Sequence, residues 1–242
     1  MDRVYTKEVK IGNTFIGKYH PIAIQSMTNT NTEDIKATIE QINKLYSLGC
    51  DIIRVAVPNM YAAKALKQIK PNINIPLIAD IHFNYKLAIA AVENGADKIR
   101  INPGNIGGKQ KINEIIKCAK EYNIPIRIGV NSGSLNKKML SINKGNIVRA
   151  MVASADEYIK LFNDFGFDNI VVSLKSSNVI TTIDSYEMFS KNHSYPLHVG
   201  ITEAGALING VIKSSVGIGK LLSEGIGDTI RVSLTADPAE EI

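Results

Sequence analysis

Basic side chains lie inside several segments that are otherwise rich in β-branched and other apolar residues. Each lies in a different segment of the chain, and the five are Arg54, Arg100, Arg127, Lys175 and Arg231. A buried guanidinium is costly unless it meets an anion or a carboxylate. Because Arg offers a planar fork that matches phosphate oxygens and Lys adds a point charge, these residues indicate a site for a multiply charged anion.

Polar residues share the spacing of the basic ones. Side chains two positions apart on a strand point to the same face. The polar residues two positions from a basic residue, or from one another, are Asn102, Asn131, Ser173, His198, Thr202 and Ser233. Only Asp80 and Glu203 supply acids on these faces. An internal salt-bridge network is the alternative, but isolated buried pairs are only weakly favourable, so a ligand site is preferred.

Three further features could take part in chemistry. Glu203, just after an apolar segment, is a lone carboxylate among cations and the candidate proton donor or acceptor, with an Arg counter-ion as the alternative. Asp80 and His82 share one face, which suits an acid–base pair, a metal pair or a structural hydrogen bond. The glycines of residues 102–109 would let backbone N–H groups approach phosphate, although ordinary turn chemistry explains them equally well.

Eight expected strands position these residues. They are residues 21–28, 51–57, 76–81, 98–102, 125–131, 169–175, 196–202 and 229–234. Amphipathic stretches lie between them; residues 34–48, for example, have apolar side chains at three- and four-residue spacing. Strict alternation of strand and helix favours a closed (β/α)₈ TIM barrel over a doubly wound sheet. Sites in such barrels lie at the C-terminal ends of the strands.

Both ends of the chain refine this prediction. Residues 8–17 are expected to form a β-hairpin that plugs the bottom of the barrel. Asp237 and Pro238, followed by acids, are typical of a helix N-terminus, and the sequence stops within that first turn. We therefore interpret residues 1–242 as a single substrate-binding barrel domain whose eighth helix is truncated. The uncovered flank is expected to lower its stability.

Composition argues against several function classes. The 242 residues are 45% hydrophobic and 21% charged, which is ordinary for a globular protein. No apolar run reaches the roughly 18 to 20 residues of a membrane span, and the charged N-terminus does not resemble a secretory signal, so a cytoplasmic protein is expected. The net charge of +5 suits an acidic partner. Because lysines are scattered along helices without an RNA-binding motif, nucleic-acid binding is not expected.

Cysteine usage bears on metals. Cys50 and Cys118 are far apart and lie in apolar helical stretches, where a free cysteine behaves as a small hydrophobic residue. Two cysteines are too few for the usual ligand set of an iron–sulfur cluster. No metal site is therefore expected in this chain.

The sequence resembles the 4-hydroxy-3-methylbut-2-enyl diphosphate synthase family of the non-mevalonate isoprenoid pathway. The most specific matching segments are ADIHF at residues 79–83, RINPGNIG at 100–107 and GIGDTIRVSL at 225–234. The resemblance implies an oxidoreductase with a TIM barrel. Members of the family open the ring of 2-C-methyl-D-erythritol 2,4-cyclodiphosphate, remove a hydroxyl as water and add two electrons.

The resemblance also implies roles for individual residues. The catalytic residue would be Glu203, which matches the family's carboxylate near the reacting centre. The substrate-binding residues would be Arg54, His82, Arg100, Asn102, Arg127, Asn131, Lys175, Arg231 and Ser233. Among these, the basic residues would hold the diphosphate, and Asn131 and Ser233 would donate hydrogen bonds to it.

The family uses parts that this sequence lacks. Its electrons arrive through a [4Fe–4S] cluster held by three Cys and a Glu in a C-terminal domain, which closes over the other subunit's barrel in a homodimer. No cysteine here matches those ligands. The resemblance therefore implies substrate binding by this chain, without turnover by this chain alone. Ferredoxin or flavodoxin would be the electron donor of the full-length form.

Two other functions stay open. A pterin-type barrel transferase resembling dihydropteroate synthase would share the basic barrel mouth and a diphosphate substrate, although RINPGNIG and GIGDTIRVSL match the first family. A non-catalytic barrel that binds a phosphorylated metabolite is the other alternative, and it agrees with the missing cluster ligands.

Overall fold

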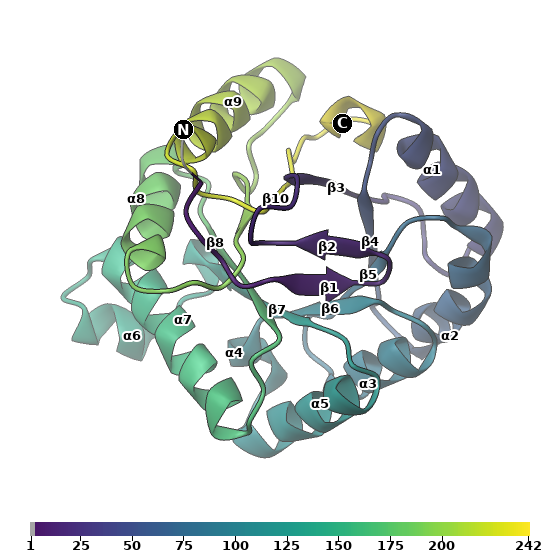
Figure 1. Ribbon diagram of the computed structural model, residues 1–242, viewed down its shortest axis with the longest axis horizontal. Helices are drawn as coiled ribbons and strands as arrows, with labels where there is room; N and C mark the ends of the chain where they lie inside the picture. Colours follow the sequence, from purple (N-terminus) through teal and green to yellow (C-terminus); the bar gives the residue numbers. More distant parts are fainter. Residues whose placement is uncertain (1–2) are drawn as a thin grey trace.

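Eight parallel strands carry the site in this computed structural model, which describes residues 3–242. Their order in the sheet is β8-β7-β6-β5-β4-β3-β10-β9. A parallel bridge between Val172 and Leu197 joins the two edges, and the Val172 N–H donates to the carbonyl of Pro196 at 2.9 Å. The sheet thereby closes into a ring with helices outside it (Figure 1). The predicted (β/α)₈ barrel is confirmed.

Each barrel strand lies within its predicted range. The strands are β3 (Ala23–Met27), β4 (Ile52–Ala56), β5 (Leu77–Asp80), β6 (Lys98–Ile101), β7 (Ile126–Asn131), β8 (Ile170–Lys175), β9 (His198–Val199) and β10 (Thr229–Ile230). Alternate side chains such as Ile53 and Val55 of β4 belong to the large apolar core between sheet and helices. Their neighbours, such as Arg54, face the barrel interior, because successive strand residues point to opposite faces.

Most of the helices begin where an Asn or Asp side chain accepts a backbone N–H. The helices are α1 (Ile35–Ser47), α2 (Met60–Ile69), α3 (Tyr85–Glu93), α4 (Pro103–Ile106), α5 (Lys109–Glu121), α6 (Lys137–Ile142), α7 (Ile147–Asp164), α8 (Val179–Ser190) and α9 (Leu207–Ser223). Side-chain caps of this kind are Asp34, Asn59, Asn84, Asn102, Asn136, Asn146 and Asn178; α5 and α9, which begin after Gly108 and Ala206, do not have one. Each cap satisfies a backbone donor that the first helical turn leaves free. None of the helices in residues 3–242 is both long and apolar enough to cross a bilayer.

The N-terminal hairpin closes one end of the barrel. Its strands, β1 (Val9–Ile11) and β2 (Thr14–Ile16), pair antiparallel and lie across the ring in Figure 1. Ile11 and Ile16 are fully buried in a cluster with inward-facing strand residues, namely Ala23, Ile52, Ile78 and Val171. The predicted plug is confirmed.

Three short 3₁₀ helices complete the described chain: η1 (Lys70–Asn72), η2 (Ser132–Ser134) and η3 (Pro238–Glu241). The helix start predicted at Asp237 and Pro238 is present, because the Asp237 carboxylate accepts the N–H of Ala239 at 2.9 Å. Glu241 in this turn is buried, which brings an acid to the barrel interior.

Candidate active site

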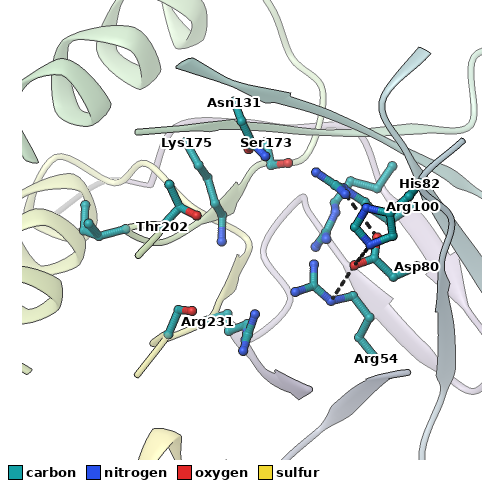
Figure 2. A pocket seen from close by; sticks show the side chains of 12 residues that line it. Arg54, Asp80, His82, Arg100, Asn131, Ser173, Lys175, Thr202 and Arg231 are labelled. Atoms are coloured by element: carbon teal, nitrogen blue, oxygen red, sulfur yellow. Dashed lines mark hydrogen bonds and ion pairs between the residues drawn. The ribbon is translucent and has the colours of Figure 1, made fainter. Parts of the chain in front are cut away.

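A cavity of about 190 Å³ lies at the C-terminal ends of the barrel strands. Every barrel strand except β3 contributes to its wall, either directly or through the residues just after it. Its lining residues are Arg54, Asp80, His82, Arg100, Arg127, Asn131, Ser173, Lys175, Ile201, Thr202, Arg231 and Ser233 (Figure 2). All of the predicted binding residues except Asn102 therefore meet around one cavity.

Asn102 lies beside the site rather than in it. It is buried at the start of α4, where its Oδ1 accepts the N–H of Gly104 at 3.1 Å. Its Nδ2 donates to the Ser134 hydroxyl at 3.0 Å. The amide thus joins the loop after β6 to the loop after β7, and it does not line the cavity. Its predicted contact with substrate stays a prediction.

Glu203 is exposed, and it is not among the residues that line the cavity. It follows Thr202, which does line it. Its backbone has a φ of 50°, a left-handed conformation that a non-glycine residue rarely adopts. The structure thus holds the carboxylate in an unusual turn beside the site, and its role in proton transfer stays a prediction.

Asp80 is the acid in the wall of the cavity. Its Oδ1 lies 3.1 Å from Arg100 Nη1, and its Oδ2 lies 3.7 Å from Arg54 Nε and 3.8 Å from His82 Nε2 (Figure 2). Burial opposes ionisation of this carboxyl, but the charges of Arg54 and Arg100 outweigh it and lower the pKa of Asp80 to about 2. Asp80 is therefore ionised at neutral pH and fixes the two guanidinium groups.

Arg231 has a partner that sequence reasoning missed. Its Nε and Nη2 lie 3.2 Å from Oε2 and Oε1 of Glu241, which makes a two-pronged pair. Glu241 also accepts hydrogen bonds from the Ser26 hydroxyl at 3.2 Å and from the Leu234 N–H at 3.1 Å. The sequence signal was the acid in the turn after Pro238, which agreed equally well with an exposed helix N-terminus.

Positive charge exceeds negative charge in the barrel interior. The basic side chains are Arg54, Lys98, Arg100, Arg127, Lys175 and Arg231, whereas the carboxylates that pair with them are those of Asp80 and Glu241. The buried carboxylate of Asp228 pairs with Arg3 instead. Burial, with repulsion from Arg231 and Arg100, lowers the pKa of Arg54 to about 10. Burial and repulsion from Arg127 hold the pKa of Lys175 well below its usual range. An anion in the cavity would relieve this repulsion.

Two glycines leave room for the cationic groups. A Cβ at Gly129, on the inner face of β7, would lie 2.7 Å from Arg100 Nε. A Cβ at Gly200, just after β9, would lie 2.3 Å from the Arg231 carbonyl oxygen and 2.8 Å from Lys175 Nζ. Contacts this short do not occur for real Cβ atoms, so any larger residue would displace the charged groups. Neither glycine was singled out in the sequence analysis, since a glycine in a strand has several explanations.

The described residues do not fit an iron–sulfur cluster. Within residues 3–242 no group of three or more His, Cys, Asp or Glu side chains is placed to hold a metal ion. Cys50 and Cys118 are buried, and burial raises the pKa of each thiol to about 11. Since metals bind the thiolate form, these cysteines are unsuited as ligands.

Comparison with known proteins places the chain in a family. The model of the GcpE TIM-barrel domain matches residues 6–242. The chain belongs to the GcpE family. A relative from Caldicellulosiruptor saccharolyticus is 60% identical over 237 residues, which cover 98% of this chain and 68% of the relative. A relative from Clostridium acetobutylicum is 55% identical over 242 residues, which cover 100% of this chain and 69% of the relative. Both are named 4-hydroxy-3-methylbut-2-en-1-yl diphosphate synthase (flavodoxin), so the resemblance stated from the sequence is confirmed.

Solved structures share the fold of this GcpE-family barrel. Dihydropteroate synthase from Yersinia pestis superposes with a TM-score of 0.65 at 10% identity, covering 92% of this chain and 90% of that one. A 3-dehydroquinate dehydratase from Geobacillus kaustophilus gives a TM-score of 0.61 at 12% identity, covering 98% and 93%. Likeness at this identity concerns the barrel architecture alone, so it does not favour the pterin-type transferase as the function.

Proposed function

We propose that this chain is the substrate-binding barrel of a 4-hydroxy-3-methylbut-2-en-1-yl diphosphate synthase, and that its cavity binds 2-C-methyl-D-erythritol 2,4-cyclodiphosphate. The observation that carries the proposal is the convergence of four arginines and a lysine on one cavity whose lining contains a single carboxylate, Asp80. Relatives at 52–60% identity that carry this enzyme's name support it. A barrel that only binds a phosphorylated metabolite would use the same cavity, and no observation favours it over the enzyme.

The geometry suits a cyclic diphosphate. Figure 2 shows the guanidinium groups of Arg54, Arg100 and Arg231 and the ammonium group of Lys175 directed toward a common space. Each phosphorus of the ring carries one ionised oxygen, so several cations can each accept part of the charge. When the ring opens, negative charge grows on the leaving phosphate oxygen. Cations already fixed around it stabilise that charge without reorganisation.

We infer that the redox half of the reaction uses residues other than those of this barrel. A [4Fe–4S] cluster, as the family resemblance implies, would supply two electrons, and the residues of this barrel do not fit its ligand set. We infer flavodoxin as the electron donor, because the relatives are named for it. The homodimer and the cytoplasmic location stay predictions.

Glu203 is the proposed proton donor or acceptor. Replacing Glu203 by Gln in a full-length enzyme is expected to preserve cyclodiphosphate binding and to abolish most turnover, because the amide cannot transfer a proton. Steady-state kinetics beside a binding titration separate the two effects. Near-normal turnover would remove the catalytic role, and lost binding would instead make Glu203 a substrate contact.

Calorimetric titration of the purified chain with the cyclodiphosphate tests the proposal, with inorganic pyrophosphate as the charge control. Selective binding of the cyclic ligand is expected, because the side chains of Asn131, Ser173, Thr202 and Ser233 also line the cavity. They can bond the hydroxyl groups of its carbon skeleton, which pyrophosphate lacks. Equal or absent binding of the two ligands, in protein that still melts cooperatively, would refute the assignment of the cavity.

A further inference from the structure

Two basic side chains lie inside the barrel without lining the cavity. Lys98 of β6 and His198 of β9 are both completely buried, and neither is among the cavity residues. The side-chain nitrogen of Lys98 has no hydrogen-bond partner within residues 3–242. The imidazole of His198 has its Nδ1 2.7 Å from the Thr229 hydroxyl, whereas its Nε2 is unpartnered in the same residues.

The groups that face this pair are cationic. Arg127 of β7 and Arg54 of β4 repel both side chains, and Lys175 of β8 also repels His198. Lys98, when charged, repels His198 as well. Arg127 connects the pair to the cavity, since it lines the cavity and is 99% buried, with Nη1 3.4 Å from the Gln25 amide oxygen. Its nearby carboxylate is Asp80, which already pairs with Arg54 and Arg100. Beneath the cavity, therefore, basic groups adjoin one another, and within residues 3–242 they have no carboxylate of their own.

The charged forms of Lys98 and His198 are disfavoured in this buried, basic environment. A buried ammonium that lacks both a hydrogen bond and a counter-ion pays a large desolvation cost, and the usual outcome is loss of its proton. A dianion held by Arg127 from the cavity side would change this balance. Its field would cancel much of the repulsion that Lys98 and His198 experience, in an interior where charges are weakly screened.

We propose that Lys98 and His198 are uncharged in the empty barrel and take up protons when a doubly charged anion enters the cavity, so that anion binding and protonation of this pair are coupled. The inference rests on the proposed function, because it requires an anion in the cavity. It assigns these two side chains a part in binding although neither touches the ligand. The barrel thus adjusts its internal charge to whether the site is filled.

The direction of the pKa values agrees with this geometry. Burial, then repulsion from Arg127 and Arg54, holds the pKa of Lys98 well below its usual range. Burial, then repulsion from Lys175 and Arg127, does the same to the pKa of His198. A bound anion raises both. Between the pKa of the empty state and that of the filled state, binding consumes protons, and affinity for an anion of fixed charge must fall as pH rises.

Calorimetry in buffers with different heats of ionisation measures the coupling. The ligands are the cyclodiphosphate and, as a simple probe, sulfate; both keep their charge between about pH 6 and 9. In the unaltered chain the binding enthalpy is expected to vary with the buffer, with a slope of roughly one to two protons taken up per anion, since two groups contribute. Lys98→Met and His198→Asn should each reduce that slope, and asparagine can still bond to Thr229. Lys64→Met, the same change on an exposed part of α2, should not alter it.

The outcomes separate this inference from the proposed function. Cyclodiphosphate binding with no buffer dependence overturns the inference and leaves the proposed function intact. Sulfate binding with proton uptake, but no cyclodiphosphate binding, supports the inference and refutes the proposed function. If the folded chain binds neither anion, both are refuted.

Thermal melting gives a readout that does not depend on ligand. Lys98→Met should raise the melting temperature of the empty chain by about 2 to 4 °C, because an unpaired buried amine is replaced by an apolar side chain of similar length. Lys64→Met should leave it unchanged. A lower melting temperature for Lys98→Met would mean that the amine makes a stabilising interaction in the empty barrel, which contradicts the inference. If that variant does not fold, the buffer dependence of His198→Asn compared with the unaltered chain decides, because Lys175 in the cavity wall could also take up a proton. An unchanged slope in His198→Asn would then overturn the inference.

Discussion

Asp80 shows how a single carboxylate orders the cationic wall. It lies between Arg54, Arg100 and His82, all within 4 Å, and it is 3% exposed. A buried acid among so many cations serves as a fixed counter-charge rather than as a proton donor, because its ionised form is strongly favoured at neutral pH. The neighbouring arginines are thereby held in place before any ligand arrives.

Replacing Asp80 by Asn should therefore destabilise the fold by about 2 kcal/mol at neutral pH. The folded pKa of about 2 lies below the ordinary 3.8, so the stabilisation is fully present above the ordinary pKa. It disappears as pH falls toward the folded value. Chemical denaturation at several pH values should show the gap between the two proteins shrinking below about pH 4. A gap that is constant down to pH 3 would contradict the ion-pair explanation.

Arg127 and Arg231 test the anion contacts. Each change to Ala should weaken cyclodiphosphate binding by about 2 to 4 kcal/mol, since a charged hydrogen-bond donor to phosphate is lost. Arg149→Ala, on the exposed surface of α7, is the control of equal charge change. Binding titrations measure all three. Unchanged affinity in both cavity variants would refute the assignment of the cationic mouth.

At the scale of elements, the inner face of β7 has a glycine, Gly129, where the Arg100 side chain of the neighbouring strand β6 lies against it. Gly129→Ala would bring a Cβ to 2.7 Å from Arg100 Nε, so the guanidinium must move away from Asp80. We expect anion affinity to fall about tenfold, or ~1.4 kcal/mol, with the fold retained. Gly133→Ala, two residues past the same strand, meets no atom within 4 Å and serves as the control. Equal affinities of the two variants would show that Arg100 position does not matter for binding.

The N-terminal hairpin makes a separate prediction about stability. Ile16 is fully buried in the barrel floor, whereas Phe15 on the same strand is 41% exposed. Ile16→Ala should cost about 2 to 5 kcal/mol through lost contacts and a cavity. Phe15→Ala should cost under about 1 kcal/mol, as is usual for surface changes. Urea denaturation compares them, and similar costs for both would mean that the hairpin does not support the barrel.

The elements were predictable because their patterns are local. A β-branched run with a basic residue inside it, such as residues 51–57, predicts both a strand and an inward-facing arginine. Contacts that join distant segments were not predictable. Glu241, in a turn after the last strand, forms an ion pair with Arg231. Asn102 donates a hydrogen bond to Ser134 and does not line the cavity. That Lys98 has no acid beside it in the described part of the chain also depends on how the strands close, which no short pattern specifies.

For the whole molecule, closure of the barrel is what turns scattered charges into a site. Strands from both halves of the chain contribute to one cavity. The helices cover the outer face of the barrel, and the hairpin covers one of its ends. Bringing like charges together lowers the stability of the empty fold, which is a common cost of a functional site. Part of the net charge of +5 comes from these clustered basic side chains. A bound anion would restore the stability lost to their repulsion, because a ligand that binds only the folded state stabilises it.

A crystal structure of this chain with 2-C-methyl-D-erythritol 2,4-cyclodiphosphate tests the central claim most directly. Both phosphate groups should lie in the cavity at the strand ends, within hydrogen-bond distance of Arg127, Lys175 and Arg231. Density for the ligand at another place, such as the groove between α4 and α7 lined by Gly108 and Tyr158, with the strand-end cavity free of it, would contradict the account.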